Sequence, residues 1–209
     1  MGIREKAKKI IASVPRNVKI LAATKGRSRE EINEAINAGI RIIGENYVQE
    51  AASKCAGINA ELHLIGHLQT NKAKNAVEIF DMIQSIDSFR IANEVQKECE
   101  KAGKKMNVLI EVNIGMEKSK SGCMPSEVMQ LAEKIAGMPN LRLKGLMVVS
   151  PDAEEDVDRK YYKISKKVFD DLGKSHKGIE TLSMGMSNSF MAAIEEGSNM
   201  IRLGRAIFG

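Results

Sequence analysis

The sequence alternates short aliphatic, β-branched runs with amphipathic stretches of helical period, and this alternation is its most constraining feature. The apolar runs predict eight strands, over residues 18–24, 40–44, 61–66, 81–86, 107–113, 143–149, 180–184 and 199–204. The stretches between them predict helices over 28–39, 49–55, 70 to about 77, 88 to about 102, 125–136, a segment ending near 172, and 190–195. An amphipathic, charged segment at the N-terminus predicts one additional helix.

Strands that alternate with helices are expected to be parallel, because each crossover is helical. Eight such units suit a closed barrel, so the sequence predicts an α/β fold: a single (β/α)8 TIM barrel with an extra N-terminal helix. A length of 209 residues is enough for one well-buried domain, expected to span 1–209. A doubly wound open sheet is the alternative that periodicity leaves open. Neither GxGxxG nor GxxxxGK is present, which weakens the nucleotide-binding versions of that alternative.

Composition argues against several other classes of protein. The sequence contains no run of about eighteen apolar residues, the length needed to span a bilayer. The N-terminus lacks the apolar core of a secretory signal. Three scattered cysteines without CxxC spacing suggest reduced thiols and a cytoplasmic location. The net charge of +5 comes from basic residues intermixed with 27 acidic ones, so we expect a solvated surface and no nucleic-acid partner. His63 and His67 lack an evident third ligand, so we expect no metal site.

The last 26 residues, 184–209, have the layout of a phosphate site, with two turns of small residues separated by a short helix. In (β/α)8 barrels the loops after the seventh and eighth strands commonly hold a phosphate through backbone N–H groups. The Ser187 hydroxyl can donate to a phosphate, and Gly185 and Gly204 allow close approach of the backbone. By itself this segment would suit any phosphorylated ligand.

Lys25 follows the first predicted strand and is therefore expected at the mouth of the barrel. It could be a surface lysine that terminates a strand, or an amine that attacks an aldehyde. A lysine that forms a Schiff base and a phosphate site in one cavity together suggest pyridoxal 5'-phosphate (PLP).

Arg202, on the eighth strand, is the candidate partner of the PLP ring nitrogen. A guanidinium stays charged and cannot accept the proton that a pyridinium would donate, so the ring nitrogen would remain unprotonated. That would weaken the cofactor as an electron sink. The alternative is an inward barrel residue paired with a carboxylate such as Glu111.

Several segments resemble those of the pyridoxal phosphate homeostasis proteins, a family similar to the N-terminal barrel domain of alanine racemase. These are GENYVQE (44–50), HLIGHLQTNKAK (63–74), QSIDS (84–88), KSGC (120–123), GLMVVSP (145–151) and the C-terminal run. The match covers nearly the whole chain. Several motifs in the same order at the same spacing are more specific than any one alone.

The resemblance implies a role for individual residues. Lys25 would form the internal aldimine, and Arg202 would face the pyridine nitrogen. The remaining cofactor-binding set would be Asn46 beside the cofactor, His67 at the cavity edge, Met184 and Met186 against the ring, and Ser187, Gly204 and Arg205 at the phosphate. Ser189 stands where the family usually has an acidic residue, and we expect it to cap the following helix. Arg205 stands where small residues are common, and could equally be a surface arginine.

The resemblance implies a PLP carrier that acts in vitamin B6 homeostasis, with no assigned catalytic turnover and no catalytic residues. The alternative is a PLP-dependent amino-acid racemase. In such racemases a second base comes from an extra β-domain and a partner subunit, and we expect this chain to lack it and to be a monomer. A phosphosugar isomerase using Lys25 and Glu111 is a further alternative without PLP.

Overall fold

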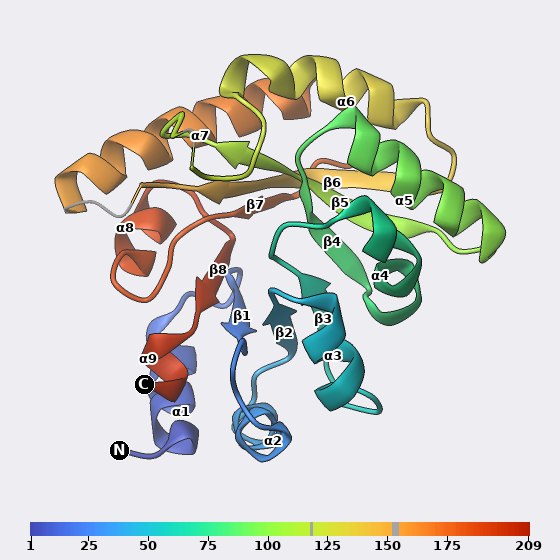
Figure 1. The fold of residues 1–209 in the computed structure, drawn as a ribbon. Coiled ribbons are helices and arrows are strands. Elements are labelled where there is room, and N and C mark those ends of the chain that lie inside the picture. The colour runs from blue at the N-terminus through green and yellow to red at the C-terminus, as the bar shows by residue number, and fades with distance from the viewer. Residues whose placement is uncertain (118, 152–154) are drawn as a thin grey trace.

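The computed structural model describes residues 1–117, 119–151 and 155–209 (Figure 1). Its strands are β1 (Lys19–Ala23), β2 (Ile42–Glu45), β3 (Glu61–Leu64), β4 (Met82–Ile86), β5 (Met106–Asn113), β6 (Leu141–Val149), β7 (Thr181–Ser183) and β8 (Met200–Leu203). Its helices are α1 (Ile3–Ser13), α2 (Arg29–Asn37), α3 (Val48–Lys54), α4 (Ala73–Ile79), α5 (Phe89–Lys101), α6 (Val128–Ala136), α7 (Glu155–Ser175), α8 (Phe190–Glu195) and α9 (Arg205–Phe208). Short 3-10 turns, η1 (Thr70–Lys72) and η2 (Pro125–Glu127), precede α4 and α6.

The strands form a closed barrel in which every neighbouring pair is parallel. The barrel closes where β1 pairs with β8, with Leu21 opposite Arg202 and Ala22 opposite Leu203. This pairing joins the first and last strands of the chain and excludes the open-sheet alternative. The prediction of an α/β barrel is therefore confirmed.

The core has two layers, because successive side chains of a strand point to opposite faces of the sheet. The larger layer lies between strands and helices and contains Ala22, Ile43 and Leu203. Two smaller groups of side chains fill the barrel interior: one contains Leu21, Ile42 and Met200, and the other Met82, Leu109 and Met147. This alternation tells which polar residues near the strand ends share the interior face.

The N-terminal helix α1 packs against α2 and α9 (Figure 1). Ala7 and Ile10, together with Val14 directly after the helix, pack into the outer layer of the core. Because α9 has only four residues, α1 covers the part of the outer ring next to it. The expected extra N-terminal helix is thus observed, whereas α9 was not predicted.

Other boundaries differ little from expectation. The capping box of α2 forms as predicted: Ser28 Oγ accepts from the Glu31 amide at 3.3 Å, and Glu31 Oε2 accepts from the Ser28 amide at 2.8 Å. The seventh strand is shorter than predicted, three residues instead of five. Among the described residues, no helix is both long and apolar enough to cross a bilayer.

Candidate ligand-binding site

The closure of the barrel places the turn after β1 beside the residues that follow β8. Lys25 lies two residues beyond the end of β1, and Gly204 directly follows β8. A Cβ built on Gly204 would lie 3.5 Å from the carbonyl oxygen of Ala23. The Arg27 guanidinium lies 5.6 Å from the centre of the Phe208 ring. This contact also connects the turn after β1 to α9. Lys25 itself is exposed at this junction.

Alternation along the strands assigns the predicted residues to faces of the sheet. Leu21 and Ala23 face the barrel interior, and Lys25 lies in the turn directly after this strand. Met200 faces the interior as well, so Arg202 and Gly204 share its side of β8. Because β1 pairs with β8, Lys25 and Gly204 follow neighbouring strand ends, and Arg202 lies on the interior face of β8 beside them.

Arg202 is buried and held by the neighbouring strands β7 and β6. Its Nη1 donates to the carbonyl oxygen of Ser183 at 2.7 Å and to the Ser183 hydroxyl at 2.9 Å, and its Nη2 donates to the Val148 carbonyl oxygen at 2.8 Å. Arg202 therefore binds these backbone and hydroxyl oxygens instead of forming the ion pair with Glu111 that the sequence left open. Burial lowers the pKa of Arg202 to about 10, so the side chain remains a cation at neutral pH. The Nε–H and one Nη2 proton have no acceptor among the described residues and can donate to a ligand.

Ser187 connects the loop after β7 to the start of α9. Its Oγ accepts a hydrogen bond from the backbone N–H of Ala206 at 3.1 Å, which leaves the hydroxyl proton available. Among the described residues, the backbone N–H groups of Gly204 and Arg205 have no backbone or side-chain acceptor. One hydroxyl and two amides near the start of α9 are thus candidate donors to a phosphate.

Asn46 and His67 follow β2 and β3 at the same end of the barrel. Gly66 packs directly on Asn46, because a Cβ on Gly66 would lie 2.3 Å from the Asn46 carbonyl oxygen. Only a glycine allows these two strand ends to approach so closely. His67 Nδ1 lies 3.2 Å from Asp87 Oδ2, and the side chain of His67 is half exposed.

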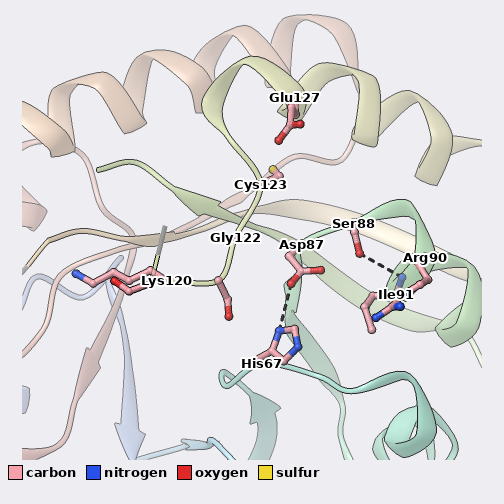
Figure 2. A pocket seen from close by; sticks show the side chains of 11 residues that line it. His67, Asp87, Ser88, Arg90, Ile91, Lys120, Gly122, Cys123 and Glu127 are labelled. Carbon is pink, nitrogen blue, oxygen red and sulfur yellow. Dashed lines mark hydrogen bonds and ion pairs between the residues drawn. The ribbon is translucent and has the colours of Figure 1, made fainter. Parts of the chain in front are cut away.

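His67 lines an open cavity of about 590 Å³ between the loops after β3, β4 and β5 (Figure 2). Other residues around this cavity include Asp87, Arg90, Lys120 and Glu127. As far as the described residues go, the lining does not include Lys25, Ser187 or Arg202. His67 thus faces a cavity that the described residues of the β1–β8 junction do not line.

Glu111 occupies an interior position on β5; it was predicted as a possible partner of Arg202 and as a residue of the isomerase alternative. Its Oε2 is buried and has no hydrogen-bond partner within the described parts of the chain. Burial, and secondarily the negative charge of Asp87, raise the pKa of Glu111 to about 7, although Arg202 opposes this. The carboxyl group can therefore hold a proton at neutral pH.

Two further predicted residues lie apart from the others. Met184 is fully buried in the outer layer of the core, since it follows the interior residue Ser183 by one position. Met186 is exposed in the next loop. The Arg205 side chain is exposed at the first position of α9, so it is its backbone amide that lies with the phosphate donors.

The expected role of Ser189 as a helix cap is wrong in its detail. Ser189 is at the cap position of α8, but its side chain makes no capping hydrogen bond. Its Oγ instead lies 2.7 Å from the hydroxyl oxygen of the buried Tyr162 on α7 and accepts from the Met186 amide at 3.4 Å. The buried tyrosine competes for the hydroxyl, so Ser189 fixes the loop after β7 to α7.

Comparison with known proteins gives consistent matches over nearly the whole chain. The family model described as alanine racemase, N-terminal domain, matches residues 2–209. The pyridoxal phosphate homeostasis proteins of Vibrio alginolyticus and Escherichia coli K12 are 41% and 40% identical over 204 residues, covering 93% of this chain and 87% and 86% of theirs. The homologue from Pseudomonas aeruginosa is 38% identical over 199 residues, covering 93% and 85%.

Solved structures show the same similarity. PipY of Synechococcus elongatus, solved without PLP, superposes with a TM-score of 0.93 at 30% identity, covering 99% of this chain and 100% of its own. The same protein with PLP bound gives a TM-score of 0.88. Alanine racemase from Clostridium difficile, at 17% identity and a TM-score of 0.84, shares the fold over all of this chain and 55% of its own.

Proposed function

This chain belongs to the pyridoxal phosphate homeostasis protein family, and we propose that it binds PLP covalently through Lys25 and holds it without catalytic turnover. Relatives at 38–41% identity carry the homeostasis name, and the similar PipY structure contains PLP. The proposed binding residues are Lys25, Asn46, Ser187, Arg202, Gly204 and the backbone of Arg205, with His67 at the outer edge.

The observation that carries this proposal is the pairing of β1 with β8. It brings an exposed primary amine, a buried guanidinium and the donors at the start of α9 to one side of the barrel mouth. In the part of the chain that the structure describes, no acceptor takes the protons of the Ser187 hydroxyl or of the Gly204 and Arg205 amides. The described residues therefore fit a ligand with an aldehyde at one end and a phosphate at the other.

When bound, PLP supplies an aldehyde that condenses with a primary amine with loss of water, a ring that can withdraw electrons, and a phosphate that anchors it. Lys25 provides the amine at an exposed position where a ligand can enter. Ser187 and the two amides hold the phosphate. Asn46, packed against Gly66, borders the site from the side of β2.

Arg202 supports holding the ligand over transforming it. Its guanidinium is fixed by Ser183 and Val148 and remains charged, so it can donate to the ring nitrogen but cannot protonate it. A neutral ring nitrogen withdraws electrons weakly, which disfavours carbanion chemistry such as racemization.

The test is to incubate the purified protein with PLP, record its visible absorption, reduce with borohydride and map the modified peptide by mass spectrometry. We expect a band that bleaches on reduction and a stable mass increment on Lys25. Lys25→Ala should lose both, whereas Lys9→Ala, at an exposed position on α1, should keep both. A wild-type protein that shows no band would contradict the proposal and favour the phosphosugar isomerase.

A racemase assay tests the non-catalytic part separately. The PLP-loaded protein should not racemize alanine at enzyme-like rates. Sustained racemization that is lost in Lys25→Ala would establish the alternative function on the same fold.

A further inference from the structure

Lys25 is carried by a tight turn whose conformation depends on a glycine. Residues 24–27 form this turn, closed by a hydrogen bond from the Arg27 amide to the Thr24 carbonyl oxygen at 3.0 Å. Lys25 is its second residue, and Gly26 is its third, with φ of 68°. A positive φ at the third position is the mark of a type II turn. The orientation of the Lys25–Gly26 peptide thus defines the backbone from which the Lys25 side chain extends.

Two side chains from α3 bind this turn directly. Glu50 Oε2 accepts a hydrogen bond from the backbone N–H of Gly26 at 3.1 Å. Lys54 Nζ donates to the carbonyl oxygen of Thr24 at 2.8 Å. Glu50 and Lys54 are four residues apart on one face of the helix and form an ion pair at 3.0 Å. The turn is therefore held at both sides of Lys25.

The pair on α3 is anchored in the interior of the protein. Lys54 Nζ also lies 3.0 Å from Oε1 of Glu45, whose side chain is fully buried at the end of β2. The hydroxyl of Thr24 donates to the same oxygen of Glu45. Thr24, Glu45, Glu50 and Lys54, here called the β1–α3 clamp, thus connect the Lys25 turn to the buried ends of two neighbouring strands.

We infer that Glu50 and Lys54 are positioning residues for Lys25, holding its turn in the orientation that lets the amine capture an aldehyde. A turn of this kind can convert to type I by rotation of its central peptide, which reverses the direction of the Gly26 N–H. The Glu50 carboxylate stabilises only the orientation in which that N–H faces α3. Holding the reacting group in place before the ligand arrives increases the rate of bond formation.

This inference rests on the proposed function, and its experiment separates covalent capture from simple binding. The rate of capture is followed by absorbance after mixing with PLP. Binding without capture is measured with pyridoxine 5'-phosphate, which has an alcohol in place of the aldehyde. Glu50→Ala should slow capture about tenfold, because it removes the acceptor of the Gly26 amide. Its affinity for pyridoxine 5'-phosphate should remain within about twofold of wild type, since the phosphate donors lie elsewhere.

A conservative variant and a matched control sharpen this test. Glu50→Gln retains an oxygen that can accept from the Gly26 amide and should recover most of the rate. Glu94→Ala removes a glutamate that pairs with Lys97 on α5, and should leave both measurements unchanged. Equal capture rates for Glu50→Ala and wild type would overturn the inference, as would a proportional loss of pyridoxine 5'-phosphate affinity. Failure of the wild type to capture PLP would instead contradict the proposed function.

Gly26 provides an independent test if Glu50→Ala does not fold. A Cβ on Gly26 would meet no atom within 4 Å, so substitutions there act through the backbone alone. Gly26→Val should slow capture because a β-branched residue disfavours positive φ, whereas Gly26→Asn tolerates it and should stay near wild type. If both variants capture PLP at the wild-type rate, the orientation of the turn does not control capture.

Discussion

Arg202 and Ser183 are joined by two hydrogen bonds from a single nitrogen, with Nη1 donating to the Ser183 carbonyl oxygen at 2.7 Å and to its hydroxyl at 2.9 Å. A third bond from Nη2 reaches Val148 on β6 at 2.8 Å. The guanidinium therefore links three consecutive strands, in addition to its proposed role toward the ligand.

Arg202→Met should destabilise the apo-protein, because two buried carbonyl oxygens would lose their donor. We expect the free energy of unfolding to fall by about 3 kcal/mol. Denaturant unfolding without PLP measures this. Arg16→Met, at an exposed position before β1, is the control and should change stability by less than about 0.5 kcal/mol. Similar values for the two variants would show that the strands do not depend on this link.

Glu111 should make stability depend on pH. Burial raises its pKa from 4.5 to about 7, so the folded state holds a proton that the unfolded chain has released. The stabilisation that this proton gives to the folded state is complete below about pH 4.5 and is lost as the pH rises through about 7. Between pH 5 and pH 8 the free energy of unfolding of the wild type should fall by about 2 kcal/mol more than that of Glu111→Gln, whose side chain cannot titrate.

The measurement is denaturant unfolding of the apo-protein at both pH values. Glu78→Gln, an exposed glutamate on α4, should follow the wild type. A wild type and Glu111→Gln that change in parallel would show that the Glu111 carboxyl does not titrate in this range.

Lys54→Met should be strongly destabilising, because it leaves the buried Glu45 carboxylate without its cation. Breaking a buried ion pair from one side costs about 3 kcal/mol or more. Combining it with Glu45→Gln should recover part of this loss. Lys97→Met, which removes an exposed pair on α5, should cost less than about 1 kcal/mol. A Lys54→Met variant as stable as Lys97→Met would argue against a buried anchor for the clamp.

Ser187→Ala should weaken binding of phosphorylated ligands specifically. The change removes a hydroxyl donor and the acceptor of the Ala206 amide, so affinity for PLP should fall about tenfold. Affinity for pyridoxal, which has no phosphate, should not change. Ser53→Ala, an exposed serine on α3, is the matched control. An equal loss for PLP and pyridoxal would place the phosphate elsewhere.

The positions of the strands along the chain could be predicted from sequence, because each strand of this barrel is a short apolar run bounded by a turn or a helix cap. The pattern also placed Lys25 and Arg202 at the correct strand ends. Their proximity, however, depends on β1 pairing with β8, which no local pattern encodes. Periodicity alone left the open sheet as an alternative for this reason.

The features that sequence missed depend on contacts between distant residues. The Gly26 amide and Glu50 are separated by 24 positions, and Ser189 and Tyr162 by 27. A charged pair such as Glu50 and Lys54 on a helix usually indicates a solvated face, so their spacing did not distinguish them. Helix α9 was missed because four residues are too few to show a period.

The closure between β1 and β8 also sets an order of events during synthesis. Lys25 precedes Arg202 and Gly204 by more than 170 positions in the sequence, so it leaves the ribosome well before them. A chain interrupted before β8 would have the amine but would lack the proposed phosphate donors at Gly204 and Arg205. If the proposed site is correct, retention of the ligand requires the closed barrel, and it can serve as a direct readout of complete folding.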